Sequence, residues 1–98
     1  MSNNIISWIE NWYCSQCDGE WEHDYGVKIE TLDNPGWSLM VNLKGTPKES
    51  ANVSLTKINR SETDWIHYCV REAQFEAFGG AKNLEEMLCI FKDWIMKD

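Results

Sequence analysis

The sequence lacks any long apolar run. No stretch of its 98 residues approaches the roughly 20 consecutive apolar residues that a membrane-spanning helix needs. The segment from Met1 to Asn4 is polar, and the apolar positions that follow are interrupted by Ser7, Glu10 and Asn11, so we expect no secretory signal peptide. These absences predict a cytoplasmic protein that does not bind membranes and whose four cysteines stay reduced.

Basic residues are scarce. Nine lysines and arginines stand against sixteen acids, which gives a formal net charge of −7. Between Glu10 and Asp33 there are seven acids and one base, Lys28, a net −6. Such a field repels nucleic acid and attracts basic partners, so we expect a positively charged macromolecular partner and no bound nucleic acid. The alternative is that the acidity only keeps the protein soluble.

The sequence also lacks the common catalytic and metal-binding patterns. It has no glycine-rich phosphate loop and no nucleophile in a recognisable elbow. Cys14 and Cys17 have a spacing that can bind zinc, but a structural zinc site needs four ligands, and Cys69 and Cys89 form no second close pair. We therefore expect ordinary thiols, no metal, no cofactor and no enzyme activity.

A short acidic run is the one remaining candidate for metal chemistry. Glu20, Glu22 and Asp24 alternate as in a calcium loop, but the downstream glutamate of such a loop is missing at the right distance. A metal-dependent enzyme built on Glu22, His23 and Asp24 is the third of three hypotheses for the function. The two ranked above it are binding functions, which are given at the end of this section.

The N-terminal segment has the periodicity of an amphipathic helix. Its apolar residues recur at steps of three and four from residue 5 to residue 13. Asn3 or Asn4 can cap the start, and Asp18-Gly19 can stop the helix because glycine accepts positive φ. We predict a helix over residues 3–17, followed by an acidic loop over residues 18–26.

Two alternating segments flank a strong turn signal. In Asn34-Pro35-Gly36 the proline presets φ and the glycine accepts the left-handed position. Residues 27–33 and 37–43 on either side of it alternate apolar and polar side chains. Together they predict a β-hairpin.

Two further strands are predicted downstream. Residues 52–59 place Val53 and Leu55 on one face, and residues 63–72 alternate in the same way. Residues 73–81 fit either a short edge strand or a packed loop that ends at Gly79-Gly80.

The last segment predicts a second helix. Asn83 and Glu86 have the spacing of a capping box, and one apolar stripe follows. The stripe consists of Leu84, Met87, Leu88, Phe91, Trp94 and Ile95. We therefore predict one domain over residues 1–98 with an α+β fold. It is a two-layer structure in which a four-stranded or five-stranded antiparallel meander is covered on one face by an N-terminal and a C-terminal helix.

Six tryptophans are many for a chain of this length. We expect Trp8, Trp12 and Trp94 in the core. Trp21 has only polar neighbours and is expected to be partly exposed, because an aromatic ring among acids suits contact with lysine and arginine.

Several stretches resemble one known family. They are Trp8-Ile9-Glu10-Asn11-Trp12-Tyr13, Gln16-Cys17-Asp18-Gly19-Glu20-Trp21-Glu22-His23, Gly26-Val27-Lys28-Ile29-Glu30-Thr31-Leu32-Asp33-Asn34-Pro35-Gly36-Trp37, and Asn83-Leu84-Glu85-Glu86-Met87-Leu88 with Phe91 and Trp94. Over nearly the whole chain these stretches are similar to the immunity protein 53 family, whose pattern includes Cys17 and not Cys14. The resemblance implies an immunity protein of a bacterial polymorphic toxin system, which protects the producing cell by binding its cognate toxin.

The leading hypothesis is therefore stoichiometric inhibition of a toxin by a monomer or weak dimer. If the toxin is a nuclease, its basic groove would match the acidic charge. The expected contacts are Asp18, Glu20, Trp21, Glu22, His23 and Asp24, with Asp33 and Trp37 behind them. The runner-up hypothesis is a small-ligand or carbohydrate-binding module that stacks its ligand on Trp21 and Trp37.

Overall fold

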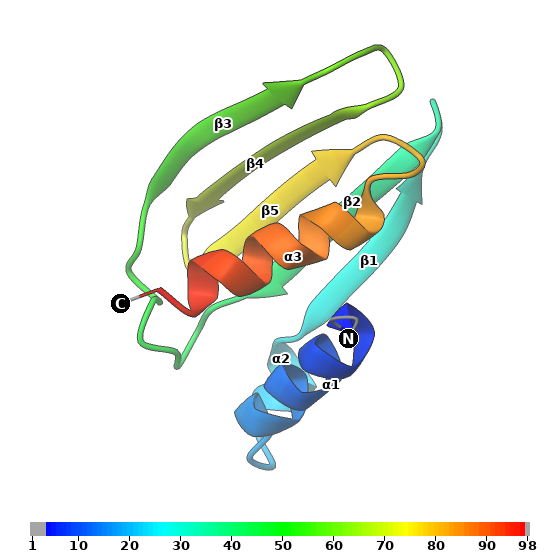
Figure 1. Cartoon of the computed structure of the whole chain (residues 1–98). Helices are drawn as coiled ribbons and strands as arrows, with labels where there is room; N and C mark the ends of the chain where they lie inside the picture. Colours follow the sequence, from blue (N-terminus) through cyan, green and yellow to red (C-terminus); the bar gives the residue numbers. More distant parts are fainter. Residues whose placement is uncertain (1–3, 98) are drawn as a thin grey trace.

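A computed structural model describes residues 4–97 as a five-stranded antiparallel sheet with three helices (Figure 1). The elements in chain order are α1 (Ile5–Gln16), α2 (Trp21–Asp24), β1 (Val27–Leu32), β2 (Gly36–Asn42), β3 (Val53–Asn59), β4 (Trp65–Arg71), β5 (Gln74–Gly79) and α3 (Leu84–Ile95). The predicted α+β class, with a helix at each end of the strand region, is confirmed. Among the described helices, none has the length and apolar character needed to cross a membrane.

The strand order differs from that of a simple meander. The sheet runs β1-β2-β5-β4-β3, so β2 pairs with β5 and not with β3. The link over residues 43–52 crosses the end of the sheet to the far edge, which leaves a place beside β2 (Figure 1). Residues 74–79, expected as an edge strand or a loop, fill that place as the central strand. Phe75 and Ala77 of this strand are fully buried.

Gly36 serves the packing of strands and not the turn conformation expected of it. Positive φ angles among the described glycines occur at Gly19 and Gly45. A Cβ at Gly36 would instead overlap the carbonyl oxygen of Gly79 on the neighbouring strand. The glycine is needed there because the start of β2 lies against the end of β5.

The helices cover one face of the sheet. The apolar stripe of α3 packs on β2 and β5, with Met87, Leu88 and Phe91 buried. From α1, Ile5 and Ile9 are buried in the same core, and Asn4 caps the helix by accepting from the Ser7 N–H. Asn3, the other cap candidate, lies outside the described residues.

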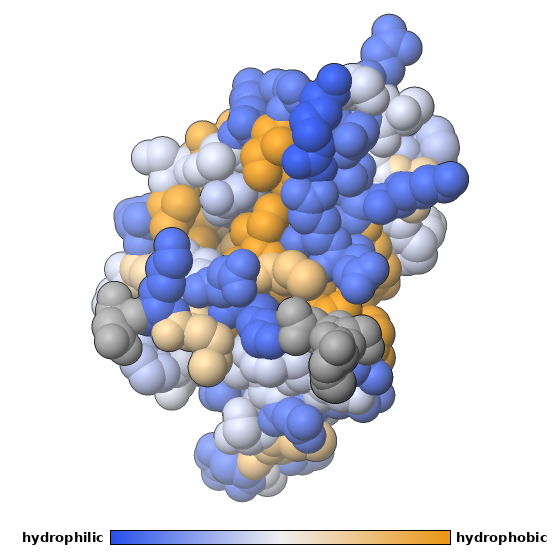
Figure 2. Space-filling model, in the orientation of Figure 1, coloured by the Kyte–Doolittle hydropathy of each residue, from blue (hydrophilic) through white to orange (hydrophobic). Residues whose placement is uncertain are grey.

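The expected core tryptophans lie where predicted. Trp8, Trp12 and Trp94 are partly buried and pack against the core cluster. Seen from the side of α3, apolar side chains show in the middle of the surface between hydrophilic ones (Figure 2). Helices α1 and α3 therefore cover this face of the sheet.

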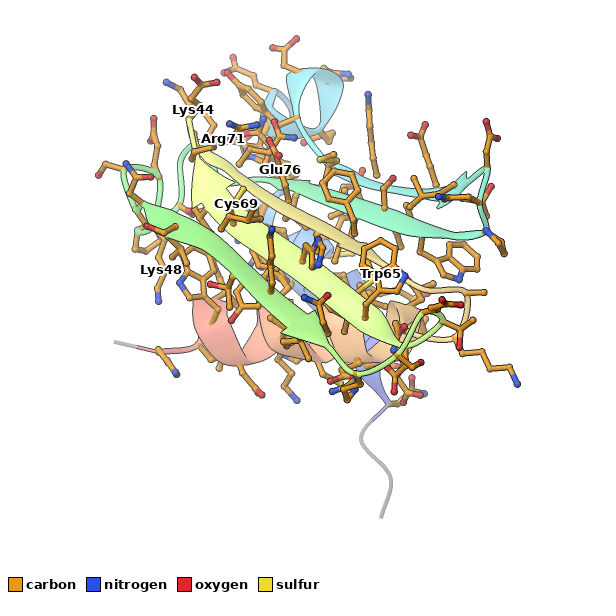
Figure 3. All side chains as sticks on the ribbon, turned by 90° about the horizontal axis from the view of Figure 1, so that it is seen from above. Lys44, Lys48, Trp65, Cys69, Arg71 and Glu76 are labelled. Atoms are coloured by element: carbon orange, nitrogen blue, oxygen red, sulfur yellow. The ribbon has the colours of Figure 1, made fainter. Side chains whose placement is uncertain are left out.

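The other face of the sheet carries no helix over most of its width. We call it the helix-free face, and strand register assigns to it Lys28, Glu30, Ser38, Met40, Asn42, Lys57, Trp65, His67, Cys69, Arg71, Gln74, Glu76 and Phe78. Arg71 and Glu76 lie on the side of the sheet away from α3, and Lys48 lies on the side of α3 (Figure 3). His67 on this face is half-buried, and its Nε2 lies 2.9 Å from Asn59 Oδ1.

The prediction for Leu55 was wrong. Its side chain is 58% exposed, although it was expected beside Val53 on the core face. The register of β3 against β4 shifts between Val53 and Thr56, and such a bulge inserts one extra residue and re-aims the side chains around it.

The capping box predicted for α3 does not form. Asn83 occupies the N-cap position, but its side chain makes no capping hydrogen bond. Its Oδ1 accepts from the backbone N–H groups of Trp65 and Gly80, and its Nδ2 donates to Asp64 at 3.0 Å. Glu86 pairs with Arg60 instead. The Asn83 amide thus joins the β3–β4 loop to the start of α3.

These contacts predict a large effect of Asn83→Ala on stability. The substitution removes the side-chain acceptor of the Trp65 N–H and one of two partners from both the Gly80 N–H and Asp64 Oδ1, at a site that is 6% exposed. We therefore expect a loss of about 2 kcal/mol in the free energy of unfolding. Urea denaturation measures it. Asn52→Ala, at an exposed position, is the matched control and should change stability by less than about 0.5 kcal/mol. Equal losses in the two variants would contradict the role given to Asn83.

Candidate functional site

The acidic segment after α1 contains a short helix in place of the expected loop. Trp21 begins this helix, α2, and is 7% exposed, so the prediction of a partly exposed ring was wrong. Its ring centroid lies 6.2 Å from that of Trp12 and 6.1 Å from those of Tyr13 and Tyr25. Its indole N–H donates to the Lys44 carbonyl at 2.7 Å. Burial satisfies both the apolar ring and its polar atom, which the polar sequence neighbours did not reveal.

Two of the predicted contact residues hold the turn before α2 in place. The Asp18 carboxylate accepts from the backbone N–H groups of Trp21 and Glu20, each at 2.9 Å, and these bonds lower the pKa of Asp18. The Glu22 carboxylate accepts in return from the N–H groups of Asp18 and Gly19, both at 3.0 Å. Gly19 sits between them at φ +96°, a conformation that favours glycine. In the Asp-Gly-x-Trp-Glu stretch, the carboxylate at each end thus accepts hydrogen bonds from backbone N–H groups at the other end of the turn.

The remaining acidic-segment residues face outward. Glu20, which immediately precedes α2, and His23 and Asp24 within α2 are all exposed. We call these three residues the α2 acidic rim. Trp21 lies on the inner side of the same helical turn. The burial of the indole therefore sets the direction in which the rim projects.

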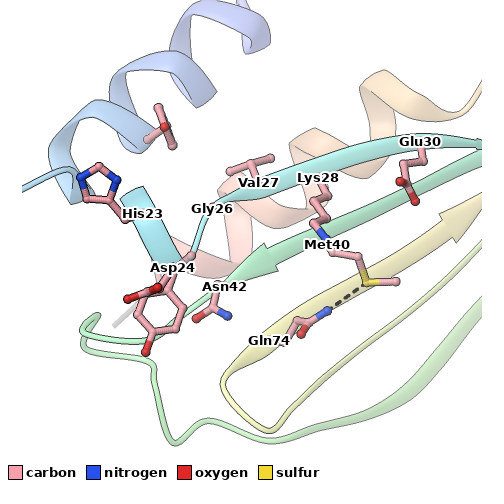
Figure 4. A pocket seen from close by; sticks show the side chains of 11 residues that line it. His23, Asp24, Gly26, Val27, Lys28, Glu30, Met40, Asn42 and Gln74 are labelled. Carbon is pink, nitrogen blue, oxygen red and sulfur yellow. Dashed lines mark hydrogen bonds between the residues drawn. The ribbon is translucent and has the colours of Figure 1, made fainter. Parts of the chain in front are cut away.

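A cleft of about 690 Å³ separates α2 from the helix-free face (Figure 4). It is lined by Tyr13, His23, Asp24, Tyr25, Gly26, Val27, Lys28, Glu30, Met40, Asn42 and Gln74. Within it, the Gln74 Nε2 donates to the Met40 sulfur at 3.1 Å. The α2 cleft combines Asp24 and two tyrosine rings with charged and uncharged strand side chains, and both Lys28 and Glu30 of β1 are among its lining residues.

The structure does not bring all eight predicted contact residues together. Asp33 lies in the turn at the far end of β1, about 20 Å from α2 for six residues at strand rise (Figure 1). Trp37 faces the side of α3, where its indole N–H donates to the Ala81 carbonyl at 2.9 Å. Asp33 and Trp37 therefore lie apart from the acidic segment, because β1 carries the chain away from α2, and their role as toxin contacts stays a prediction.

Several cleft residues were not predicted from the sequence. Lys28 and Glu30 alternate with the core-side positions of β1, so strand periodicity alone places them on the outer face. Gln74 and Met40 meet only because β5 pairs with β2, which the sequence pattern did not show.

Among the described residues, the carboxylates of this region form no salt bridge with a basic side chain. Across residues 4–97 the salt bridges are Lys44–Glu49, Arg60–Asp64, Arg60–Glu86 and Arg71–Glu76. None of these pairs uses an acid between residues 10 and 33. Two further lysines contact aromatic rings, with Lys48 Nζ 4.8 Å from the Trp94 ring and Lys92 Nζ 5.8 Å from the Trp8 ring. Many of the bases are thus engaged elsewhere in the molecule.

The geometry gives little support to the two alternative functions, a ligand-binding module built on Trp21 and Trp37 and a metal-dependent enzyme. Trp21 is buried and Trp37 lies at the far end of the hairpin, so the pair forms no shared stacking platform. In the part of the chain that the structure describes, no group of three or more His, Cys, Asp or Glu side chains is placed to hold a metal ion. The four cysteines are free thiols.

The anchoring role of Trp21 predicts a stability loss in Trp21→Phe. The substitution leaves the Lys44 carbonyl without its indole donor and opens space among three aromatic rings, so we expect a loss of about 2–3 kcal/mol in the free energy of unfolding. Thermal or urea unfolding measures it. Trp65→Phe is the matched control on the helix-free face, with an expected loss below about 1 kcal/mol. A Trp21→Phe protein as stable as the wild type would contradict the anchoring role given to the Trp21 indole.

Comparison with known proteins agrees with the resemblance seen in the sequence. The model of one family, described as immunity protein 53, matches residues 6–96. No curated protein and no solved structure matches the chain. The match covers nearly all of the chain, including α1, the α2 turn, the sheet and α3. The chain therefore belongs to the immunity protein 53 family.

Proposed function

We propose that this protein neutralises a cognate bacterial toxin by binding it through the α2 acidic rim and the adjoining α2 cleft. Membership of an immunity family supports protection from a toxin as the biological role. The protein acts as a stoichiometric inhibitor in this proposal and carries out no chemical step. The proposed contacts are Glu20, His23, Asp24 and Glu30.

The single observation that carries the proposal is the unbalanced charge of the region. Glu20, Asp24 and Glu30 are exposed, and within residues 4–97 they form no salt bridge. Like charges held close together destabilise a folded protein, whereas a basic partner relieves that repulsion. A field of one sign also speeds capture, which suits an inhibitor that must bind a toxin before it acts.

The α2 cleft gives this charged region a concave surface that a side chain of the partner can enter. The cleft is lined by Asp24 and Tyr25 beside α2 and by Lys28 and Glu30 of β1 (Figure 4). An arginine or lysine side chain of the toxin would enter it beside Asp24 and Tyr25. Arginine in particular pairs with carboxylates and stacks on aromatic rings. A nuclease toxin, whose substrate groove is basic, is the class of partner that this surface fits best, and that step rests on charge alone.

Charge reversal on the rim tests the proposal. The toxin encoded beside this protein is purified and its binding measured by surface plasmon resonance at two salt concentrations. We expect Glu20→Lys together with Asp24→Lys to raise Kd about 100-fold, mostly through slower association, because attraction becomes repulsion at the point of encounter.

The control makes the same change in net charge at two exposed positions outside the cleft. Glu62→Lys together with Asp93→Lys alters the loop after β3 and the end of α3, both exposed positions outside the cleft. Its Kd should stay within about threefold of the wild-type value. Equal loss in both double variants would show that only net charge matters, and unchanged binding by the rim variant would remove the proposed surface.

A further inference from the structure

β1 forms a free edge of the sheet. It pairs with β2 on one side and is the outermost strand of the order (Figure 1). Its residues from Lys28 to Thr31 are all exposed, including Ile29 at 40%. A strand in this position presents unpaired backbone N–H and C=O groups that can pair with another chain.

The hydrogen-bond pattern shows which residues point those groups outward. The Asn42 N–H donates to the Gly26 carbonyl, and the two residues lie opposite each other in the extended β1–β2 register. Hydrogen-bonded pairs alternate along an antiparallel ladder, so Lys28 and Glu30 direct their backbone groups toward β2. Val27, Ile29 and Thr31 therefore direct theirs to the free edge.

The two edges of the sheet differ in regularity. β3, the other edge, contains the register shift between Val53 and Thr56, and a bulge of this kind impedes further strand pairing. β1 keeps an unbroken register with β2 from Val27 to Leu32. Only β1 offers a straight run of outward backbone groups.

We propose that β1 pairs with β1 of a second copy of this chain, forming a two-fold symmetric dimer with one continuous sheet. Antiparallel pairing centred on Ile29 sets Val27 opposite Thr31 of the copy and Ile29 opposite its own equivalent. All three residues have outward backbone groups, as the pairing requires. In the same register, Lys28 of each copy lies opposite Glu30 of the other, on the helix-free face.

Charge selects this register over its neighbours. A shift of the copy by two residues in one direction places Lys28 opposite Lys28, and a shift in the other direction places Glu30 opposite Glu30. Directly opposed like charges destabilise a strand pair, whereas opposite charges stabilise it. Self-pairing in an isologous interface makes each favourable contact occur twice.

Sedimentation equilibrium of the purified protein without any toxin tests the dimer. We expect a weak dimer with Kd of about 100 µM, because one strand pair buries little surface. Lys28→Glu and Glu30→Lys should each raise Kd about tenfold, since each variant opposes like charges when it pairs with itself. An equimolar mixture of the two variants should form a heterodimer about as tight as the wild-type dimer, because every opposed pair is then attractive.

Lys57→Glu, on the bulged strand β3, is the matched control and should leave the dimer unchanged. Circular dichroism confirms that the variants are folded. A wild-type protein that stays monomeric at about 1 mM, or variants that fail to restore association when mixed, would overturn the proposal. Because no toxin is present in the main experiment, its failure leaves the proposed function untouched.

Discussion

The indole of Trp21 lies where α1, α2 and the 43–52 link meet, and the geometry of the candidate site depends on its burial. Its ring packs among Trp12, Tyr13 and Tyr25, and its N–H is bonded to Lys44 on the link that crosses the end of the sheet. A helix of four residues such as α2 does not persist by its own backbone hydrogen bonds. The buried ring therefore holds α2 against the domain and fixes the side on which its charges project.

The acidic segment contains two kinds of residue: acids that hold its turn in place and acids that are exposed to solvent. Asp18 and Glu22 carry charge, but their carboxylates are bonded to backbone N–H groups of the turn, so they shape the segment. Glu20 and Asp24 are exposed and form no salt bridge within residues 4–97. In the sequence this stretch looks like one acidic patch. In the structure some of its acids hold the turn in place and the others are exposed.

The sequence predicted those parts of the fold that depend on local periodicity. The two terminal helices, the β1–β2 hairpin and the alternating faces of β4 follow from the spacing of apolar residues and are confirmed. The central position of β5 was missed because Ala77 and Gly79 have weak strand preference and its neighbours are set by a long-range crossover. The same limit applies to Trp21 and Asn83. Their polar surroundings in the sequence concealed partners that lie 23 and up to 19 residues away in the chain.

A map of the bound surface is the most direct test of the proposal that a toxin binds the α2 acidic rim and the α2 cleft. Amide hydrogen exchange of the protein, alone and with its cognate toxin, reports which backbone segments become protected. The account predicts protection in α2, at the start of β1 and at the ends of β2 and β5 that border the cleft, with α3 unchanged. Protection concentrated on α3, with α2 exchanging as in the free protein, would contradict it.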